Sequence, residues 1–335
     1  PLQDTQRAEL LRILQAVTFP TPDTVALAGG TVVDPRAAEQ IPGSTAPASS
    51  TVVQLQQLFY ESCYCRRFGG APSAFRGVQA PDSSFIETLA AANTSREHWD
   101  VGWRLQQLLP SGQIVAGKGA LTRMVWPGEF LSHGPPGMPS GPGTEISLFV
   151  AKESRTIQPG FYYVFGEALA DQEEELGPVR LYWNITAPGA APLVAGITAV
   201  LNRFAIPFRF KCLSVPEWFD RADAAVLYIA KRHYRVAALL LADVHRAVVQ
   251  SLKAATPLFT KPLADGLGLA EDPMTGESFG MNRCRLLAAA VCNAHARGLD
   301  TPEARLSEVT AAFAAAGLSL ERPYLNGGSA DAYAL

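Results

Sequence analysis

Six short apolar segments, separated by turns that contain glycine and proline, constrain the fold of this chain most strongly. Each segment is rich in β-branched and aromatic residues, a composition that is typical of strands. They follow one another between residues 113 and 230 as QIVAG, ISLFVA, FYYVFGEAL, RLYWNI, FRFKCL and AAVLYIA. Because no regular βαβ alternation separates them, the sequence predicts a mostly antiparallel sheet.

Helical patterns stand on both sides of these strands. Apolar residues recur at helical spacing in residues 4–17, 51–65 and 84–92, and again in three segments after residue 233. The sequence therefore predicts an α+β fold, with a mostly antiparallel central sheet flanked by helices and a helical N-terminal third. We expect residues 1–100 to form a helical N-terminal region packed on the core and residues 101–335 to form the α+β core, together as one compact unit.

The charge balance and the cysteines argue against several classes of protein. The 28 lysine and arginine residues against 31 aspartate and glutamate residues give a net charge of -3, which gives no support to binding of nucleic acid or of an anionic membrane. No apolar run approaches the roughly 18 to 20 residues that span a bilayer, and the start of the chain has no signal-peptide pattern. The five cysteines form no CxxC pair, so we expect neither disulfides nor zinc. These features predict a cytoplasmic protein.

Two of the expected strands divide their faces between apolar and polar residues. In RLYWNI, alternation places Arg180, Tyr182 and Asn184 on the face opposite to Leu181, Trp183 and Ile185. In PFRFKCL, Arg209 and Lys211 share one face. If these strands were neighbours, they would form a cationic floor suited to a phosphorylated ligand, because guanidinium groups hold phosphate oxygens in a fork. The alternative is an ordinary solvated sheet face.

Other polar residues extend the list of candidates. We expect Arg283 to emerge at the N-terminal end of an otherwise buried helix face, where anions are attracted. Lys261 lies in a proline-flanked turn, Arg221 comes shortly before a strand, and His133 lies beside a Gly/Pro-rich segment and is a possible acid. No GxSxG, Walker A, GxGxxG or HExxH motif occurs, which argues against serine hydrolases, P-loop proteins, Rossmann enzymes and zinc proteases.

Several ordered blocks in the second half resemble a known family. PGFYYVFGEAL, VRLYWN, LNRFAIPFRFKCL, FDRADAAVLYIA, TPLFTKPLADGLGLAEDP, GESFGMNR and PYLNGGS resemble the HopA-type domain over about residues 145–330. This domain occurs in type III effectors and in class V lanthipeptide and thioamitide pathways. The resemblance implies a lyase that acts after a kinase-like phosphotransferase and removes phosphate from phosphoserine or phosphothreonine of a ribosomally made precursor peptide. The products would be dehydroalanine or dehydrobutyrine, and the partners would be that kinase and the peptide, with its leader and phosphorylated core.

Elimination of phosphate assigns a chemical task to each candidate residue. A base must remove the Cα proton, and cations must neutralise the departing phosphate; neither task requires a metal or another cofactor. Arginines around a lysine favour its neutral form, so Lys211 is the favoured base, with Lys118 and Lys152 as alternatives. Tyr182 or His133 is the candidate acid. The candidates for phosphate binding are Arg180, Asn184, Arg209, Arg221, Lys261 and Arg283.

One departure from the expected pattern keeps other functions open. Phosphothreonine lyases of the effector type are expected to carry a Lys-x-His pair on one strand, and none of the six segments expected to form strands contains such a pair. A non-catalytic module that binds the leader peptide or the kinase is therefore one alternative. Another is a different effector-like phosphate-binding protein, such as one similar to ADP-ribosyl transferases.

Overall fold

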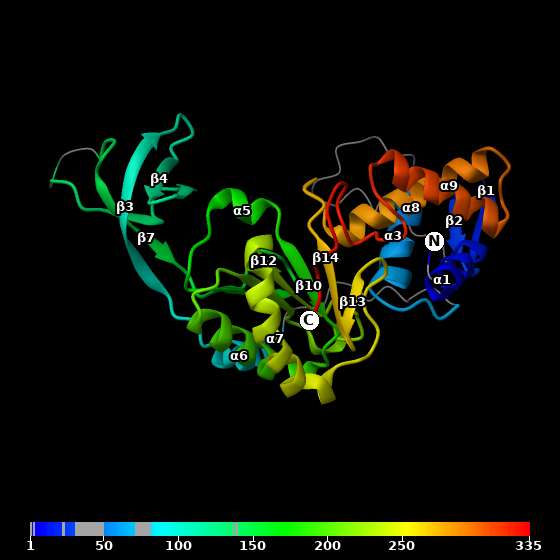
Figure 1. The fold of residues 1–335 in the computed structure, drawn as a ribbon, viewed down its shortest axis with the longest axis horizontal. Coiled ribbons are helices and arrows are strands. Elements are labelled where there is room, and N and C mark those ends of the chain that lie inside the picture. The colour runs from blue at the N-terminus through cyan, green and yellow to red at the C-terminus, as the bar shows by residue number, and fades with distance from the viewer. Residues whose placement is uncertain are drawn as a thin grey trace.

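The structure is a computed structural model that describes residues 2, 4–21, 24–30, 50–70, 82–135, 137 and 140–335. It confirms the predicted α+β fold, with helices at the N-terminus and antiparallel strand pairing throughout the described sheets. The molecule is elongated: a five-stranded sheet lies at one end, a seven-stranded sheet in the middle and a group of helices at the other end (Figure 1).

The seven-stranded sheet contains four of the six segments that the sequence predicted as strands. Its order is β13-β14-β10-β12-β11-β9-β8, so β12 separates the two strands with divided faces. The bounds are β8 Glu153–Ser154, β9 Phe161–Phe165, β10 Val179–Trp183, β11 Arg209–Leu213, β12 Ala225–Ile229, β13 Lys261–Ala264 and β14 Leu267–Glu271. Lys261 therefore begins a strand, which corrects its assignment to a turn.

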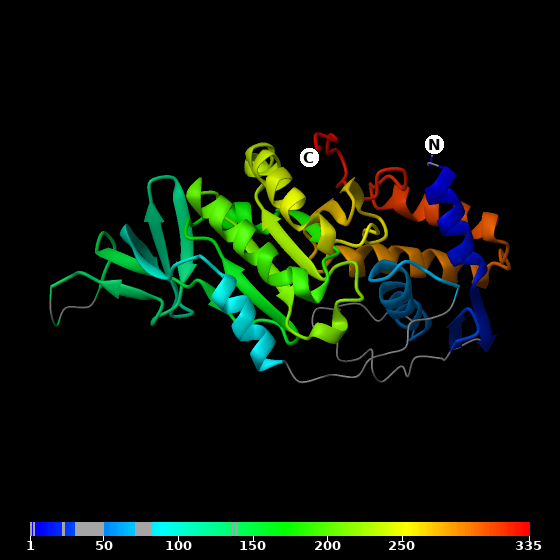
Figure 2. The same ribbon diagram turned by 90° about the horizontal axis from the view of Figure 1, so that it is seen from below.

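Helices cover one face of this sheet. They are α4 Ser83–Ala92, α6 Ala187–Arg203 and α7 Tyr234–Val248, which the view from below shows side by side (Figure 2). The odd-numbered residues of β10 face them, since the Trp183 ring lies 6.1 Å from His245 of α7. The sequence prediction missed α6 because prolines 188 and 192 and two glycines obscure its pattern, although proline fits the first turn of a helix.

The five-stranded sheet has a small core of its own. Its order is β5-β4-β3-β7-β6, with bounds β3 His98–Leu108, β4 Ile114–Lys118, β5 Leu121–Val125, β6 Phe130–Ser132 and β7 Glu145–Val150. Trp103 and Leu105 of β3 pack with Ile146 and Leu148 of β7 in a cluster separate from the main core. The short helix α5 Gln172–Leu176 lies beside β5, where the Gln172 side chain accepts a hydrogen bond from the backbone of Met124.

The opposite end of the molecule joins the two ends of the sequence. Helices α1 Asp4–Gln15 and α3 Ser50–Phe59 lie beside α9 Pro302–Ala315 and α8 Phe279–Ala296, respectively (Figure 1). A hairpin of β1 Val17–Thr21 and β2 Thr24–Leu27, which the sequence prediction missed, completes this region. The remaining short elements are the π-helix η1 Tyr60–Tyr64 and the 3-10 turns η2 Pro216–Trp218, η3 Lys231–His233 and η4 Val249–Ser251. None of the helices in the described ranges has the length and apolar character needed to cross a bilayer.

Candidate functional site

Strand register gathers three of the predicted cations, Arg180, Arg209 and Lys211, on the sheet face opposite to α6 and α7, which is called the cationic face below. Arg180 of β10 pairs with Tyr228 of β12, and Tyr228 pairs in turn with Arg209 of β11. The guanidinium carbons of Arg180 and Arg209 lie 5.4 Å and 4.6 Å from the centre of the Tyr228 ring. The two strands are not neighbours, but the tyrosine between them holds both arginines by cation–π contacts.

The next row of the same face carries a lysine and two tyrosines. Tyr182, Val226, Lys211 and Tyr163 follow one another across β10, β12, β11 and β9. Lys211 Nζ donates a hydrogen bond of 3.0 Å to Gln158 Oε1, and the Tyr163 hydroxyl donates one of 2.8 Å to the same oxygen. Burial raises the pKa of Tyr163 to about 12, so its hydroxyl stays protonated at neutral pH.

Two arginines near this face already have carboxylate partners. Arg180 is paired with Asp272, and both side chains are nearly buried. Arg221 donates two hydrogen bonds of 2.8 Å to Asp223. Burial favours a raised pKa of Asp223, but Arg221 and, more weakly, Lys211 outweigh it and lower this pKa, so the carboxylate stays charged.

Arg209 and Lys211 differ from these arginines because neither forms an ion pair with a carboxylate in the described part of the chain. They lie two residues apart on one face of β11, which separates their Cα atoms by about 7 Å. Their positive charges are therefore available to an anionic ligand.

The π-helix η1 brings aromatic hydroxyls to the edge of this face. Tyr64 packs edge-on against Tyr182 with ring centres 6.3 Å apart, and the Tyr60 hydroxyl accepts a hydrogen bond from Arg221. The Tyr182 hydroxyl is buried and has no hydrogen-bond partner of normal geometry among the described residues. Burial also raises its pKa, so it is a protonated donor. Such π-helices are rare and often occur at functional sites.

Arg283 lies deeper than the sequence prediction placed it. It is 1% exposed, in the first turns of α8, and its guanidinium donates to the carbonyl oxygens of Pro323 and Leu325 and to Asn282 Oδ1. Burial lowers its pKa to about 10. The prediction that Arg283 emerges from a buried helix face is therefore wrong. Its side chain lies in the interior, where the guanidinium donates hydrogen bonds to backbone carbonyl oxygens of the segment after α9.

Asn184 and Lys261 are also engaged elsewhere. Asn184 follows β10, and its amide donates to the carbonyl oxygen of Ala255. Lys261 pairs with Leu269, which places it on the face of the α-helices, and its ammonium binds the Asp331 carboxylate at 2.8 Å. The structure does not bring Lys261 to the face that carries Lys211.

The alternative bases and the candidate histidine occupy other places. Lys118 ends β4 and pairs with Asp100 at 2.8 Å, and His133 Nε2 lies 2.7 Å from Ser147 Oγ; both belong to the five-stranded sheet. Lys152 lies at the edge of the seven-stranded sheet, where its carbonyl oxygen accepts a hydrogen bond from Phe165, the residue that pairs with Arg209. Of these three residues, Lys152 alone lies beside the row that Arg180, Tyr228 and Arg209 form across the sheet.

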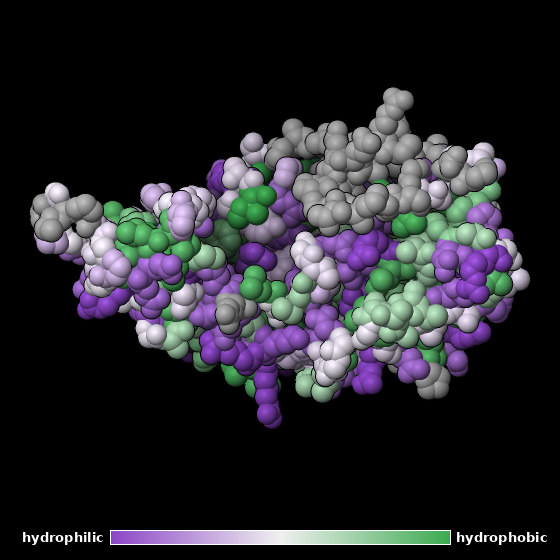
Figure 3. Space-filling view, turned by 90° about the horizontal axis from the view of Figure 1, so that it is seen from above, coloured by the Kyte–Doolittle hydropathy of each residue, from purple (hydrophilic) through white to green (hydrophobic). Residues whose placement is uncertain are grey.

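A cleft of about 370 Å³ opens between the two sheets, next to Arg209 and Tyr228. Its volume falls within the range of about 300 to 1,000 Å³ that is typical of small-molecule sites. Phe165 and Phe208 line it from the seven-stranded sheet, and Phe149 lines it from β7. Seen from above, the surface is hollowed between the two sheets (Figure 3).

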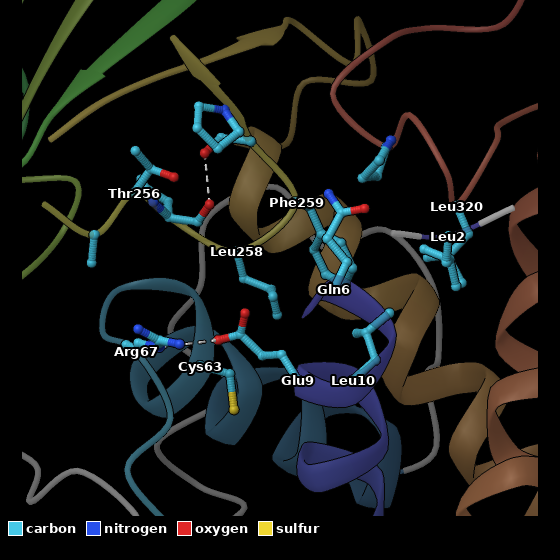
Figure 4. A pocket seen from close by; sticks show the side chains of 15 residues that line it. Leu2, Gln6, Glu9, Leu10, Cys63, Arg67, Thr256, Leu258, Phe259 and Leu320 are labelled. Carbon is cyan, nitrogen blue, oxygen red and sulfur yellow. Dashed lines mark hydrogen bonds and ion pairs between the residues drawn. The ribbon is translucent and has the colours of Figure 1, made fainter. Parts of the chain in front are cut away.

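A smaller pocket, of about 180 Å³, lies among the helices between α1, η1 and residues 255–262. Glu9 and Arg67 face each other across it, with a carboxylate oxygen and a guanidinium nitrogen 4.0 Å apart (Figure 4). Cys63 lies in its wall, and burial raises the pKa of this thiol. None of the predicted site residues lines this pocket.

Some residues of the cationic face were absent from the sequence prediction. Tyr228 contributes its ring and Tyr163 its hydroxyl, and Gln158 orients Lys211. Two carboxylates, those of Asp272 and Asp223, neutralise Arg180 and Arg221, respectively. Alternation along AVLYI and FYYVF could have marked the two tyrosines as face residues. The carboxylates come from other segments, so only the folded structure pairs them with the arginines.

Comparison with known proteins identifies the family to which this chain belongs. The sequence model of the HopA1 effector protein family matches residues 152–325, which is more than half of the chain. The chain belongs to the HopA1 effector protein family. The HopA1 match begins just before β8 and runs past α9, so it includes the whole seven-stranded sheet and leaves the five-stranded sheet outside.

Two solved structures are similar to this chain at low identity. The effector protein from Pseudomonas syringae pv. tomato strain DC3000 is 16% identical with a TM-score of 0.46, over 88% of this chain and 94% of that one. The effector protein from Pseudomonas syringae pv. syringae strain 61 is 14% identical with a TM-score of 0.47, over 98% of this chain and 100% of that one. No curated protein matches the sequence.

Proposed function

We propose that this chain is a lyase that removes phosphate from phosphoserine or phosphothreonine of a precursor peptide. In the proposed reaction a base takes the Cα proton, the electron pair forms the Cα–Cβ double bond, and the Cβ–O bond breaks. The products are a dehydroamino acid and inorganic phosphate. The observation that carries the proposal is the pair of cations Arg209 and Lys211, which form no ion pair with a carboxylate within the described ranges and lie beside buried protonated tyrosines.

Each group on the face suits one part of this reaction. Arg209 is free to hold phosphate oxygens, and the stacked Arg180 adds positive charge beside it. Lys211 projects from the same strand and is the proposed base. Proton donation to the departing bridging oxygen is assigned to the Tyr182 hydroxyl, which interacts with Tyr64 and Arg180. Lys152, at the sheet edge, remains the alternative base.

The proposed partners follow from this chemistry and from the family resemblance. A kinase-like phosphotransferase would supply the phosphorylated core of the precursor peptide. We further propose that the protein works in the cytoplasm, in maturation of a lanthipeptide or thioamitide, and that residues 1–100 form a helical region packed on the catalytic core.

Mass spectrometry of a phosphorylated core peptide tests the activity. The purified protein, with EDTA present, should yield a peptide lighter by one phosphoric acid, together with one equivalent of inorganic phosphate. Free serine or threonine in the product would instead identify a phosphatase. A phosphopeptide that remains unchanged in the presence of leader and kinase would contradict the lyase.

One observation favours a second candidate, a binding module for the phosphopeptide or the kinase. Asp272 and Asp223 already neutralise Arg180 and Arg221, so the face holds less net positive charge than the sequence suggested. A site of that kind can hold a phosphate without driving its departure. Tight phosphopeptide binding without elimination would support this function.

A further inference from the structure

The cleft between the two sheets presents apolar surface beside the cationic face. The main core and the small core of the five-stranded sheet are separate clusters, and the cleft lies where they approach each other. Phe165 and Phe208 line it from the first side, and Leu169 and Phe149 from the second. Phe149 is 42% exposed although it is a large apolar side chain.

The position of the cleft next to Arg209 restricts which groups of a ligand can fill the cleft. Arg209 and Tyr228 line the cleft and also lie on the cationic face. A ligand whose phosphate binds Arg209 would therefore place its neighbouring groups in the cleft. In an extended peptide one residue advances by about 3.3 Å, so the residues next to the phosphorylated one are the groups within reach.

The volume of the cleft and its mostly apolar lining indicate an apolar occupant. Of the charged residues in its wall, Glu175 is paired with Arg123 and Glu174 with Arg232. A cavity of about 150 Å³ with apolar walls accommodates benzene, and this cleft has about 370 Å³. It therefore has room for at least one large aliphatic or aromatic side chain. Such a side chain would join the two apolar clusters and remove Phe149 from water.

We propose that this cleft binds a large apolar side chain of the peptide within two residues of the phosphorylated serine or threonine. The inference rests on the proposed function for the identity of the ligand, a phosphopeptide. It adds that the protein selects phosphosites by an apolar neighbour, and that the five-stranded sheet supplies one wall of the substrate site.

Two fluorescein-labelled phosphopeptides test this specificity by anisotropy. They share a central phosphoserine and differ only in having leucine or alanine on both sides of it. Because a leucine side chain buries more apolar surface than an alanine side chain, the leucine peptide should bind roughly tenfold more tightly, a difference of about 1.4 kcal/mol. Equal affinities, or no measurable binding of either peptide, would overturn the inference.

Two variants with opposite effects on the cleft, and one control, make the test specific. Phe149→Ala removes part of one wall, and Ala168→Leu fills space in the cleft; both should reduce the preference for leucine to less than threefold. Leu239→Ala, at a 73% exposed position on α7, should keep it. Thermal melting confirms that each variant is folded. If both cleft variants keep the full preference, the cleft is not the site.

Product analysis separates this inference from the proposed function. A leucine preference without any dehydroamino acid would refute the lyase and leave the cleft as a peptide-binding site. Elimination at equal rates and affinities for both peptides would refute the cleft and leave the lyase.

Discussion

The two sheets of this molecule place their charged residues in different surroundings. In the seven-stranded sheet both β12 and β14 are buried along their full length, and Arg180, Arg209 and Lys211 lie on a face that other elements partly cover. In the five-stranded sheet seven residues form the whole buried cluster, and Trp99, Leu131 and Phe149 are at least 42% exposed. Both sheets place cations beside aromatic rings, but Lys118 of the smaller sheet is already paired with a carboxylate. Arg209 and Lys211 of the larger sheet form no ion pair with a carboxylate among the described residues. Function that depends on fixed charge is therefore expected on the larger sheet.

The largest effect is expected when a nearly buried ion pair of the larger sheet is broken. Arg180→Ala leaves the Asp272 carboxylate without its partner, and loss of one member of a buried pair costs about 3 to 5 kcal/mol. Arg209→Ala breaks no ion pair in the described structure and removes only the cation–π contact with Tyr228, so it should change the free energy of unfolding by about 1 kcal/mol or less. Urea denaturation of the two variants measures this contrast.

A double variant provides the control for that prediction. Arg180→Ala combined with Asp272→Ala removes both charges and should recover part of the stability that the single change loses. If Arg180→Ala and Arg209→Ala were equally stable, the ion pair with Asp272 would contribute nothing, and both arginines would be equally available to a ligand.

The next effect concerns the proposed base. Lys211→Ala should lower the elimination rate by roughly a hundredfold or more, since a general base typically contributes about 10² to 10⁴ in rate, and should leave phosphopeptide binding measurable. Single-turnover assays with anisotropy measure both quantities. Arg209→Ala should instead weaken binding and turnover together, because a phosphate contact exists in both ground and transition states.

Lys152→Ala is the matched comparison within the same sheet. It should retain most of the activity, because Gln158 orients Lys211, whereas no side chain among the described residues makes a comparable contact with the Lys152 ammonium. If Lys152→Ala abolished elimination in a folded protein while Lys211→Ala did not, the base would be Lys152. Near-normal turnover in both variants would exclude a base from either lysine.

A smaller effect should appear in acid. The folded-state pKa of Asp223 lies below its ordinary value because Arg221 outweighs the effect of burial. A carboxyl group with a lowered pKa stabilises the fold above its unfolded-state pKa, and this contribution is lost as pH falls through the folded-state value. Stability should therefore decline below about pH 4, and Asp223→Asn should flatten that part of the profile. Chemical denaturation between pH 2 and pH 7 measures the slope; an unchanged slope in the variant would contradict the assignment.

The sequence predicted four of the seven strands of the larger sheet, and the polar face of two of them, because alternation is a local property. Arg180 and Tyr182 alternate with Leu181 and Trp183, so the polar and the apolar side chains lie on opposite faces of β10. The position of Tyr228 between Arg180 and Arg209 could not be predicted, since strand order depends on contacts between distant segments.

Long-range pairing explains what the sequence prediction missed or placed wrongly. Arg283 looks like an exposed cation at a helix start, but the carbonyl oxygens that receive its hydrogen bonds come from residues 40 and 42 positions later. Lys261 likewise pairs with Asp331, which is 70 residues away. Periodicity within one helix or strand carries no information about such partners.

The smallest effects are expected for the candidate residues of the five-stranded sheet. Lys118 pairs with Asp100, but their side chains are 37% and 25% exposed, and pairs in contact with solvent contribute about 0 to 1 kcal/mol. Lys118→Ala and His133→Ala should each therefore change the free energy of unfolding by less than about 1 kcal/mol and leave the elimination rate within about twofold of the wild type. The same urea and single-turnover measurements test both variants. A large loss of elimination in either folded variant would show that the smaller sheet contributes a catalytic group, and the division between the two sheets drawn from their packing would then be wrong.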